Sequence, residues 1–227
     1  MARRRRSGQP SRGPASSRRA NWARAALLRG RYGWIVRIVA LVAITVAGIG
    51  ELRQSEWLYP VARPFDRADY PHWIDADGDC RDTRTEVLIQ ESLDPPKLSA
   101  DGCEVVSGRW YDPYTDRTFT DPRDLDVDHR VPLGEAHRSG ADRWDRARRR
   151  AYANDLSHPD TLIAVDRSAN RSKGDGDPLS WLPPAWGYRC AYVERWRETK
   201  LRWGLSEDRL ESWWIDAVLW ACGTLNR

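Results

Sequence analysis

The side chains best suited to chemistry lie in two short segments, Asp126–His129 and Asn170–Gly174. The first segment, Asp-Val-Asp-His, places a β-branched residue between carboxylates, a pattern that predicts the end of a short strand. The second segment, Asn-Arg-Ser-Lys-Gly, follows the apolar run Leu162–Val165 and predicts a short polar helix. Carboxylates, a histidine and an amide in this order indicate metal-assisted hydrolysis.

Hydrolysis of a phosphodiester needs a base for the attacking water and stabilisation of the charge that develops on phosphorus and the leaving oxygen. The imidazole of His129 is a suitable base near neutral pH. Asp128 and Asn170 offer one charged and one neutral oxygen ligand for a single Mg²⁺-class ion. Arg171 and Lys173, beside Asn170, are predicted to hold flanking phosphates. The simpler alternative for His129 alone is an ordinary surface or core histidine.

Two strands and a helix must position these groups. Leu125–Val131 is predicted as the strand that carries His129, and Leu162–Val165 as its short buried partner. The polar helix is predicted to begin at Ser168 and to end at Gly174. The order of strand, long excursion, strand and helix resembles that of a one-metal nuclease hairpin.

Other elements surround this hairpin. A helix is predicted over Thr83–Ser92, and strand-like segments over Glu104–Tyr111 and Arg117–Thr120. Two helices are predicted at the C-terminal end, separated at Gly204. The mixture of short strands and helices indicates an α+β fold.

An arginine-rich helix is predicted over Arg143–Asp155, before the second strand. Helical spacing places Arg146 and Arg150 on one face. We expect this face to hold substrate phosphates. The alternative is a solvated face whose arginines pair with neighbouring aspartates.

The basic charge of the chain is concentrated at its N-terminus. The chain has 227 residues, with 37 Lys or Arg and 33 Asp or Glu. Residues 1–37 contain eleven Arg and no acidic residue, so 26 basic and 33 acidic residues remain, a net charge of −7 after Arg37. Attraction of a polyanion must therefore depend on a local patch. Residues 1–33 are predicted to be a basic, disordered cytoplasmic tail.

An apolar stretch follows at residues 34–50. It is either a transmembrane anchor or a signal helix that is cleaved. In both cases the preceding arginines place the following chain outside the cytoplasm, either anchored to the membrane or secreted. Residues 51–69 are predicted to be a linker and residues 70–227 the exported domain. We expect a nucleic acid substrate and contact with the membrane through the N-terminal helix, and we predict no protein partner.

Four cysteines follow the apolar stretch, an even number typical of exported domains. None lies in a C-x-x-C pair, which argues against a zinc knuckle. Three disulfide pairings exist for four cysteines. We favour Cys80–Cys103 and Cys190–Cys222, because each closes a loop within one local unit.

An acidic loop precedes the first predicted helix. Asp75, Asp77, Asp79 and Glu86 lie at positions 1, 3, 5 and 12 of a calcium-loop count. The glycine of that motif belongs at position 6, where Cys80 stands instead. The loop is therefore a weak candidate for a calcium site, and the alternative is a solvated turn tied by a disulfide.

Residues 126–184 resemble the HNH class of His-Me (ββα-metal) finger endonucleases. The resemblance is greatest to the C-terminal nuclease domain of GmrSD-type restriction enzymes and to exported HNH endonuclease family proteins, and it extends over most of residues 70–222. Its matching segments are Asp126-Val127-Asp128-His129-Arg130-Val131-Pro132-Leu133, Tyr152-Ala153-Asn154-Asp155, Leu162-Ile163-Ala164-Val165-Asp166, Asn170-Arg171-Ser172-Lys173-Gly174-Asp175, Asp177-Pro178 and Trp181-Leu182-Pro183-Pro184.

The resemblance implies a ββα-metal core at about residues 104–184, flanked by helices. It implies that His129 is the general base and that Asp128 and Asn170 hold one divalent ion, Mg²⁺, Mn²⁺ or Zn²⁺. The expected activity is metal-dependent endonuclease cleavage outside the cytoplasm, of DNA in preference to RNA.

One position departs from the family pattern. An asparagine that helps to orient the histidine usually precedes the second strand, and Thr161 stands there. Asn154 is a substitute if its loop folds back, and Asp126 is a further supporting candidate. Because a threonine lacks the reach of an amide, the alternative function is a catalytically weak or inactive module that binds nucleic acid or the cell envelope.

Overall fold

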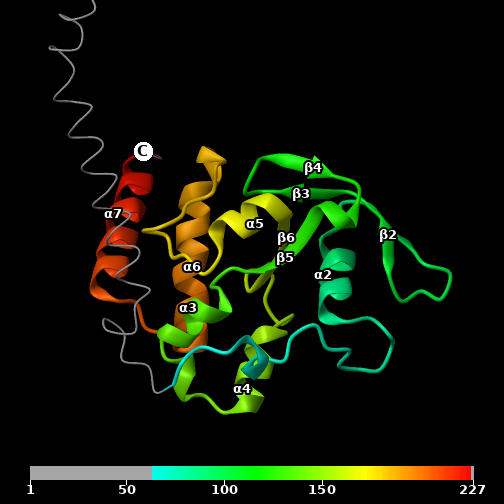
Figure 1. The fold of residues 1–227 in the computed structure, drawn as a ribbon. Coiled ribbons are helices and arrows are strands. Elements are labelled where there is room, and N and C mark those ends of the chain that lie inside the picture. Colours follow the sequence, from blue (N-terminus) through cyan, green and yellow to red (C-terminus); the bar gives the residue numbers. More distant parts are fainter. Residues whose placement is uncertain (1–62, 226–227) are drawn as a thin grey trace, which may run out of the picture. The chain divides into compact units, whose positions relative to one another are not determined.

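The computed structural model describes residues 63–225, which form a mixed α/β fold with three two-stranded sheets. Figure 1 shows the arrangement of its elements. The helices are α2 (Thr83–Glu91), α3 (Leu133–Arg138), α4 (Arg146–Ala153), α5 (Arg167–Lys173), α6 (Arg189–Trp203) and α7 (Arg209–Leu225). The strands are β1 (Lys97–Leu98), β2 (Val105–Ser107), β3 (Trp110–Asp112), β4 (Arg117–Phe119), β5 (Leu125–His129) and β6 (Leu162–Asp166).

β5 and β6 form the central antiparallel ribbon, and α5 follows β6 directly (Figure 1). His129 pairs with Leu162 at one end of the ribbon, and Leu125 pairs with Asp166 at the other. The Asp166 side chain then caps α5 by accepting a hydrogen bond of 2.8 Å from the Ala169 amide. The predicted order of strand, excursion, strand and helix is confirmed, with both strands at the expected segments.

The ribbon is buried on both faces, because hydrophobic clusters cover each side. Val87 and Leu88 of α2, with Trp110 of β3, pack on the face that carries Val127 and Ala164. The opposite face carries Asp126, Asp128, Ile163 and Val165, since side chains alternate along a strand. Ile163 and Val165 pack there in the larger cluster, whose other members come mainly from α3, α4 and α6.

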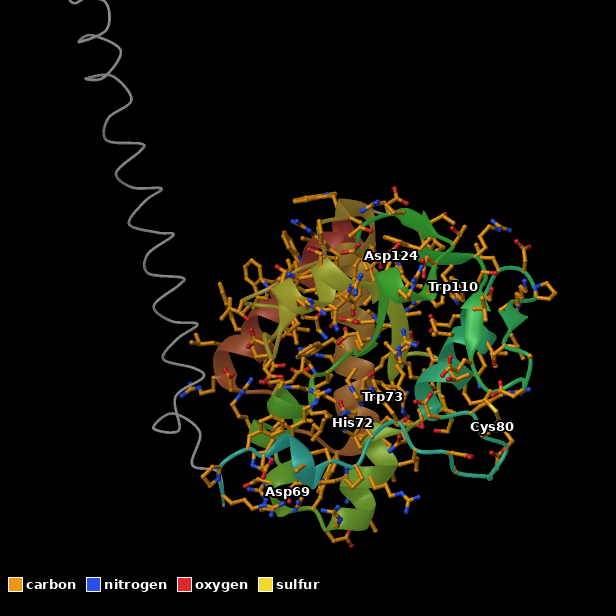
Figure 2. All side chains as sticks on the ribbon, turned by 45° about the vertical axis from the view of Figure 1, so that its right-hand side comes forward. Asp69, His72, Trp73, Cys80, Trp110 and Asp124 are labelled. Atoms are coloured by element: carbon orange, nitrogen blue, oxygen red, sulfur yellow. A yellow bond between two sulfur atoms is a disulfide. The ribbon has the colours of Figure 1, made fainter. Side chains whose placement is uncertain are left out.

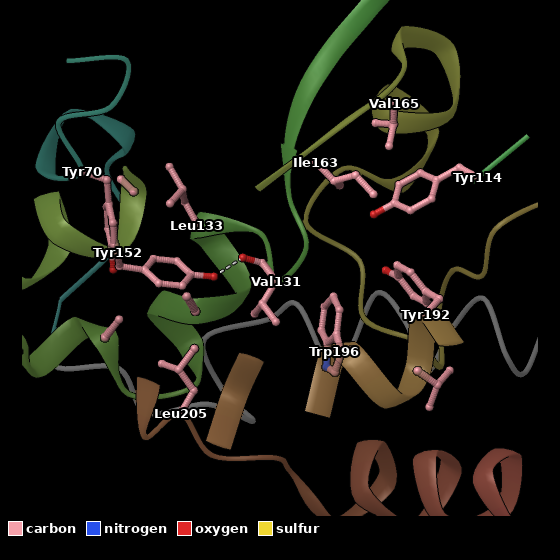
Figure 3. Packing of buried hydrophobic residues seen from close by; sticks show 14 of the residues in the cluster. Tyr70, Tyr114, Val131, Leu133, Tyr152, Ile163, Val165, Tyr192, Trp196 and Leu205 are labelled. Carbon is pink, nitrogen blue, oxygen red and sulfur yellow. Dashed lines mark hydrogen bonds between the residues drawn. The ribbon is translucent and has the colours of Figure 1, made fainter. Parts of the chain in front are cut away.

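The larger cluster fixes the chain as it leaves β5. Figure 3 shows Tyr152 of α4 extending toward Val131, whose carbonyl accepts a hydrogen bond from the tyrosine hydroxyl. Tyr114, Tyr192 and Trp196 form the other end of the same cluster. Helix α3, which the sequence analysis did not predict, begins just after Val131 with its first five residues buried. The tyrosine contact therefore anchors α4 to the segment that follows β5.

The single strand-like segment expected over Glu104–Tyr111 is divided into β2 and β3. Gly108 lies at the break, and a Cβ there would lie 2.5 Å from the Trp110 ring. Because Gly108 has no side chain, the buried Trp110 indole can pass close to the backbone there. The indole Nε1 donates a hydrogen bond of 2.7 Å to the Leu88 carbonyl of α2. β3 then forms the predicted hairpin with β4.

Both predicted disulfides are confirmed. Cys80–Cys103 ties the acidic loop to the segment before β2, and Cys190–Cys222 joins α6 to α7. No cysteine of the described chain is free. Cross-links over 23 and 32 residues of sequence separation restrict the unfolded chain and are typical of exported domains.

The predicted tail and the apolar stretch at residues 34–50 lie outside the described residues. Within residues 63–225, no helix is long and apolar enough to cross a membrane. The stretch predicted as a linker, residues 51–69, is described from Arg63 onward. That part packs against the domain: the Arg63 carbonyl accepts a hydrogen bond of 2.8 Å from His137 Nε2.

Glu91 at the end of α2 gives the fold a pH dependence. Its carboxylate accepts a hydrogen bond of 2.8 Å from the Ala164 amide of β6, and burial raises its pKa from 4.5 to about 7. Since the pKa of the folded state exceeds that of the unfolded state, protonation favours folding. This contribution is complete below pH 4.5 and is lost as the pH rises through about 7.

We therefore expect Glu91→Gln, which keeps the acceptor without the charge, to raise the free energy of unfolding at pH 8 by about 1–3 kcal/mol. The difference from the wild type should narrow as the pH falls toward 4.5. Urea denaturation of both proteins between pH 4.5 and 8 measures it. Equal pH dependence of the two proteins would contradict the assignment.

Candidate active site

Four predicted site residues surround one hollow at the end of the central ribbon. Its volume is about 210 Å³, and β5, α5 and the first turn of α3 supply most of its lining. Asp128 and His129 come from the end of β5, whereas Asn170 and Arg171 come from α5. The remaining lining residues are Arg67, Val127, Pro132, Leu133, Gly174 and Asp175.

His129 is held in one orientation by a backbone carbonyl and an indole ring. Its Nε2 lies 3.0 Å from the Ala153 carbonyl oxygen, which can only accept, so Nε2 carries the proton and Nδ1 carries the lone pair. The Trp73 ring stacks on the imidazole, with centroids 5.5 Å apart and planes inclined by 24°. Only 5% of His129 is exposed.

The surroundings keep His129 neutral. Burial is the main cause that lowers its pKa from 6.5 to about 3, and the positive charges of Arg67 and Lys173 act in the same direction. A neutral imidazole is the form that can accept a proton. An anionic group that enters the hollow would raise the pKa, because it stabilises the imidazolium.

Asp128 is bound to α5 by a buried ion pair. Lys173 Nζ lies 2.8 Å from Asp128 Oδ1 and 2.6 Å from Oδ2, and it also donates to the His129 carbonyl. The Tyr114 hydroxyl donates a hydrogen bond of 2.8 Å to Oδ2. Lys173, which we predicted to hold phosphates, is instead enclosed behind Asp128, with none of its side chain exposed.

Asn170 is oriented by Asp126. Its Nδ2 donates to Asp126 Oδ2 over 3.2 Å, which directs the amide oxygen away from that carboxylate. Arg171 Nε lies 4.0 Å from the same oxygen, and most of the Arg171 side chain is exposed. Asp126 thus supports Asn170 rather than His129, and Arg171 remains accessible at the rim of the hollow.

Thr161 and Asn154 do not contact the His129 side chain. The Thr161 hydroxyl is buried in the turn before β6, where it donates a hydrogen bond of 2.6 Å to Asp155 Oδ2. The Asn154 amide holds the N-terminal segment instead, with its Oδ1 2.9 Å from Thr83 Oγ1 and its Nδ2 2.7 Å from the Pro71 carbonyl. We predicted that one of these two side chains orients His129, whereas the Ala153 carbonyl makes that contact.

Arg146 and Arg150 line a different hollow, between α4, the start of α2 and the acidic loop. Its volume is about 770 Å³, and Arg81, Asp77 and Glu86 also face it. Both arginines are exposed, and within residues 63–225 only the Arg146 side chain makes a hydrogen bond, of 3.5 Å to the Ala68 carbonyl. The predicted phosphate-binding face is therefore accessible, but it is separate from the hollow of His129.

The acidic loop brings together three of the four residues in the calcium-loop count. Ligand oxygens of Asp75, Asp77 and Asp79 all lie within 4.8 Å of one another, and all three residues are exposed. Glu86 is not part of this group. Instead of completing a coordination sphere, the carboxylates accept hydrogen bonds from the loop itself, such as that from the Cys80 amide to Asp75 Oδ2 at 2.9 Å.

Several residues of the site were not predicted. Asp175 is the most accessible to sequence reasoning, since it directly follows the polar helix motif. A Cβ at Gly134 would lie only 2.4 Å from Asp175 Oδ2. The absence of a side chain at Gly134 therefore allows the Asp175 carboxylate to approach the hollow. Trp73, Tyr114 and the Ala153 carbonyl come from segments whose sequence carries no sign of their role.

Comparison with known proteins identifies the family. Residues 82–212 match the family of GmrSD restriction endonucleases, C-terminal domain. A protein of Arthroderma benhamiae named "Uncharacterized secreted protein" is 40% identical over 159 residues, covering 70% of this chain and 76% of that protein. No solved structure matches the chain. The matched segment contains β5, β6 and α5 with their polar residues, and the chain belongs to the family of GmrSD restriction endonuclease C-terminal domains.

Proposed function

We propose that the chain is a metal-dependent endonuclease that hydrolyses phosphodiester bonds of DNA, with His129 as general base. The observation that carries this proposal is the hollow that Asp128, His129 and Asn170 share at the junction of β5 and α5. It combines a neutral imidazole with oxygen donors of two kinds. Membership of a family of nuclease domains supports the same reaction class.

The residues that line the hollow fit a divalent ion. Asp128 Oδ1 accepts one hydrogen bond, from Lys173, and so keeps a lone pair, and the Asn170 amide oxygen is turned away from Asp126. Both are hard oxygen donors, which Mg²⁺ and Mn²⁺ prefer, and the volume leaves room for bound water. A metal bound there would stabilise negative charge on the phosphate and the leaving 3′ oxygen. We therefore assign Asp128 and Asn170 as its ligands.

His129 performs the proton transfer in this proposal. The Ala153 carbonyl fixes Nε2, so Nδ1 is the nitrogen that takes a proton from the attacking water. The low pKa of His129 makes it a weak base until substrate arrives. The negative charge of a bound phosphodiester would raise the basicity of the imidazole, whereas a metal ion in the same hollow would lower it.

The geometry gives less support to the alternative function, a catalytically weak or inactive module that binds nucleic acid or the cell envelope. It depended on Thr161 in place of the usual asparagine, but the Ala153 carbonyl orients His129 without a side chain at that position. We also propose that the chain acts outside the cytoplasm. The secreted relative and the two disulfides support this location.

Substitution of the proposed base tests the function. His129→Ala should lower cleavage of plasmid DNA with Mg²⁺ or Mn²⁺ by at least about 100-fold. His129→Gln should be equally inactive. Because the glutamine amide can still donate a hydrogen bond to the Ala153 carbonyl, loss of that hydrogen bond would not explain the loss of cleavage. Circular dichroism controls for folding. Cleavage by both variants at the wild-type rate would refute the assignment.

The metal ligands make a second prediction. Asn170→Ala should weaken Mn²⁺ binding at least about tenfold, and excess metal should partly restore cleavage. Asp128→Asn should act in the same direction, and because it leaves the charge of Lys173 without a partner, thermal unfolding controls for its folding. Calorimetric titration measures the affinity, and Asp77→Asn in the acidic loop is the control. If only the control variant changes the titration, the ion binds at the loop.

The arginine face of α4 makes a third prediction. Arg146→Glu combined with Arg150→Glu should weaken DNA affinity and flatten its dependence on salt, by a slope change of about 2. Cleavage of bis(4-nitrophenyl) phosphate, too small to reach α4 from the hollow of His129, should stay at the wild-type rate. An unchanged salt slope would indicate a solvated face with no part in binding.

A further inference from the structure

The segment before the family match, residues 63–74, forms an arm that contacts the active site. Asp69, His72 and Trp73 mark its path in Figure 2. At its end the Trp73 ring stacks on His129. Near its beginning, the short 3₁₀ turn Arg67–Asp69 is capped by Asp66, which accepts a hydrogen bond of 2.9 Å from the Ala68 amide. The site thus includes residues that precede the matched residues 82–212.

The arm is fixed to α3 by His137. Because His137 Nε2 donates to the Arg63 carbonyl, its Nδ1 must accept, and the Tyr70 hydroxyl donates to it over 2.9 Å. Tyr70 is fully buried, and its ring contacts those of Phe65 and His137. Three contacts on one histidine therefore hold both sides of the 3₁₀ turn.

The arm is also fixed to α4. Asp69 Oδ2 lies 3.8 Å from Nη1 of the buried Arg149, and the Arg149 guanidinium lies 5.7 Å from the centre of the Tyr70 ring. The turn that carries Arg67 is consequently held on two sides, so tertiary contacts fix the position of its backbone beside the hollow.

Arg67 itself is exposed and lines the hollow of His129, Asn170 and Arg171. Within residues 63–225 it makes no ion pair, whereas Arg63 in the same arm pairs with Asp69 at 3.0 Å. An exposed guanidinium that lines the hollow and has no carboxylate partner in the described chain can bind an anion there.

We propose that Arg67 is a catalytic residue that binds the non-bridging oxygens of the scissile phosphodiester. This inference rests on the proposed function. As the water oxygen bonds to phosphorus, its proton passes to His129 Nδ1 and the bond from phosphorus to the 3′ oxygen breaks. The 3′ oxygen leaves with the bond electrons and is protonated by solvent. Negative charge grows on the non-bridging oxygens during this step, and the guanidinium of Arg67 offers them paired N–H donors.

Activity toward two substrates tests Arg67. Arg67→Ala should lower kcat for both plasmid DNA and bis(4-nitrophenyl) phosphate by about 100-fold, as expected for loss of one donor to a developing oxyanion. Arg67→Lys keeps the positive charge but not the paired N–H donors of the guanidinium, so its kcat should lie between those of the wild type and Arg67→Ala. Arg209→Ala removes an exposed arginine of α7 outside both hollows and should cleave as the wild type does. Thermal unfolding of all variants controls for folding.

Binding provides a second readout that does not need turnover. In the His129→Ala background, Arg67→Ala should weaken affinity for a short DNA duplex at least about tenfold, whereas Arg209→Ala should not. If Arg67→Ala cleaves and binds as the wild type does while His129→Ala is inactive, Arg67 is not catalytic and the proposed function stands. If the folded wild type cleaves neither substrate with Mg²⁺ or Mn²⁺, both the function and this inference are wrong. If Arg67→Ala lost cleavage of plasmid DNA but cleaved bis(4-nitrophenyl) phosphate as the wild type does, Arg67 would contribute only to DNA affinity. That result would also overturn the proposal.

Discussion

The ion pair between Lys173 and Asp128 is the interaction on which the active site depends. It joins α5 to β5 inside the protein, with 0% and 6% of the two side chains exposed. Removal of one partner from a buried pair costs about 3–5 kcal/mol, because the other charge is left without compensation. Tyr114 completes the shell of Asp128, and Asn170 lies on the same helix as Lys173. One contact thus fixes the relative position of both proposed metal ligands.

The ribbon of β5 and β6 can present polar groups because hydrophobic clusters cover both of its faces. Alternation along β5 directs Asp126 and Asp128 toward α5 and directs His129 to the other face, where Trp73 covers it. The proposed base and the proposed ligand Asp128 therefore approach the hollow from different sides of one strand end. The N-terminal arm closes this arrangement, so a part of the chain outside the family match helps to form the site.

The features that sequence reasoning predicted are local ones. β5, β6, α5 and the disulfides follow from periodicity, capping residues and short loops, which neighbouring residues determine. The partners of the active site residues come from far along the chain: Trp73 reaches His129, and Tyr114 reaches Asp128. A backbone carbonyl such as that of Ala153 has no sequence signature at all. The sequence therefore suggested that His129 needs a side chain at Thr161 for its orientation, whereas the Thr161 hydroxyl binds Asp155 instead. Lys173 was predicted to bind phosphates, but its side chain is buried and holds Asp128.

The central claim is that Asp128 and Asn170 hold a divalent ion next to His129. Anomalous diffraction from crystals grown with Mn²⁺ and a short DNA duplex, using the inactive His129→Ala variant, tests it most directly. The account predicts an anomalous peak in the hollow, with Asp128 Oδ1 and the Asn170 amide oxygen as ligands and a phosphate beside it. A peak confined to the loop of Asp75, Asp77 and Asp79, with DNA bound and the hollow free of metal, would contradict it.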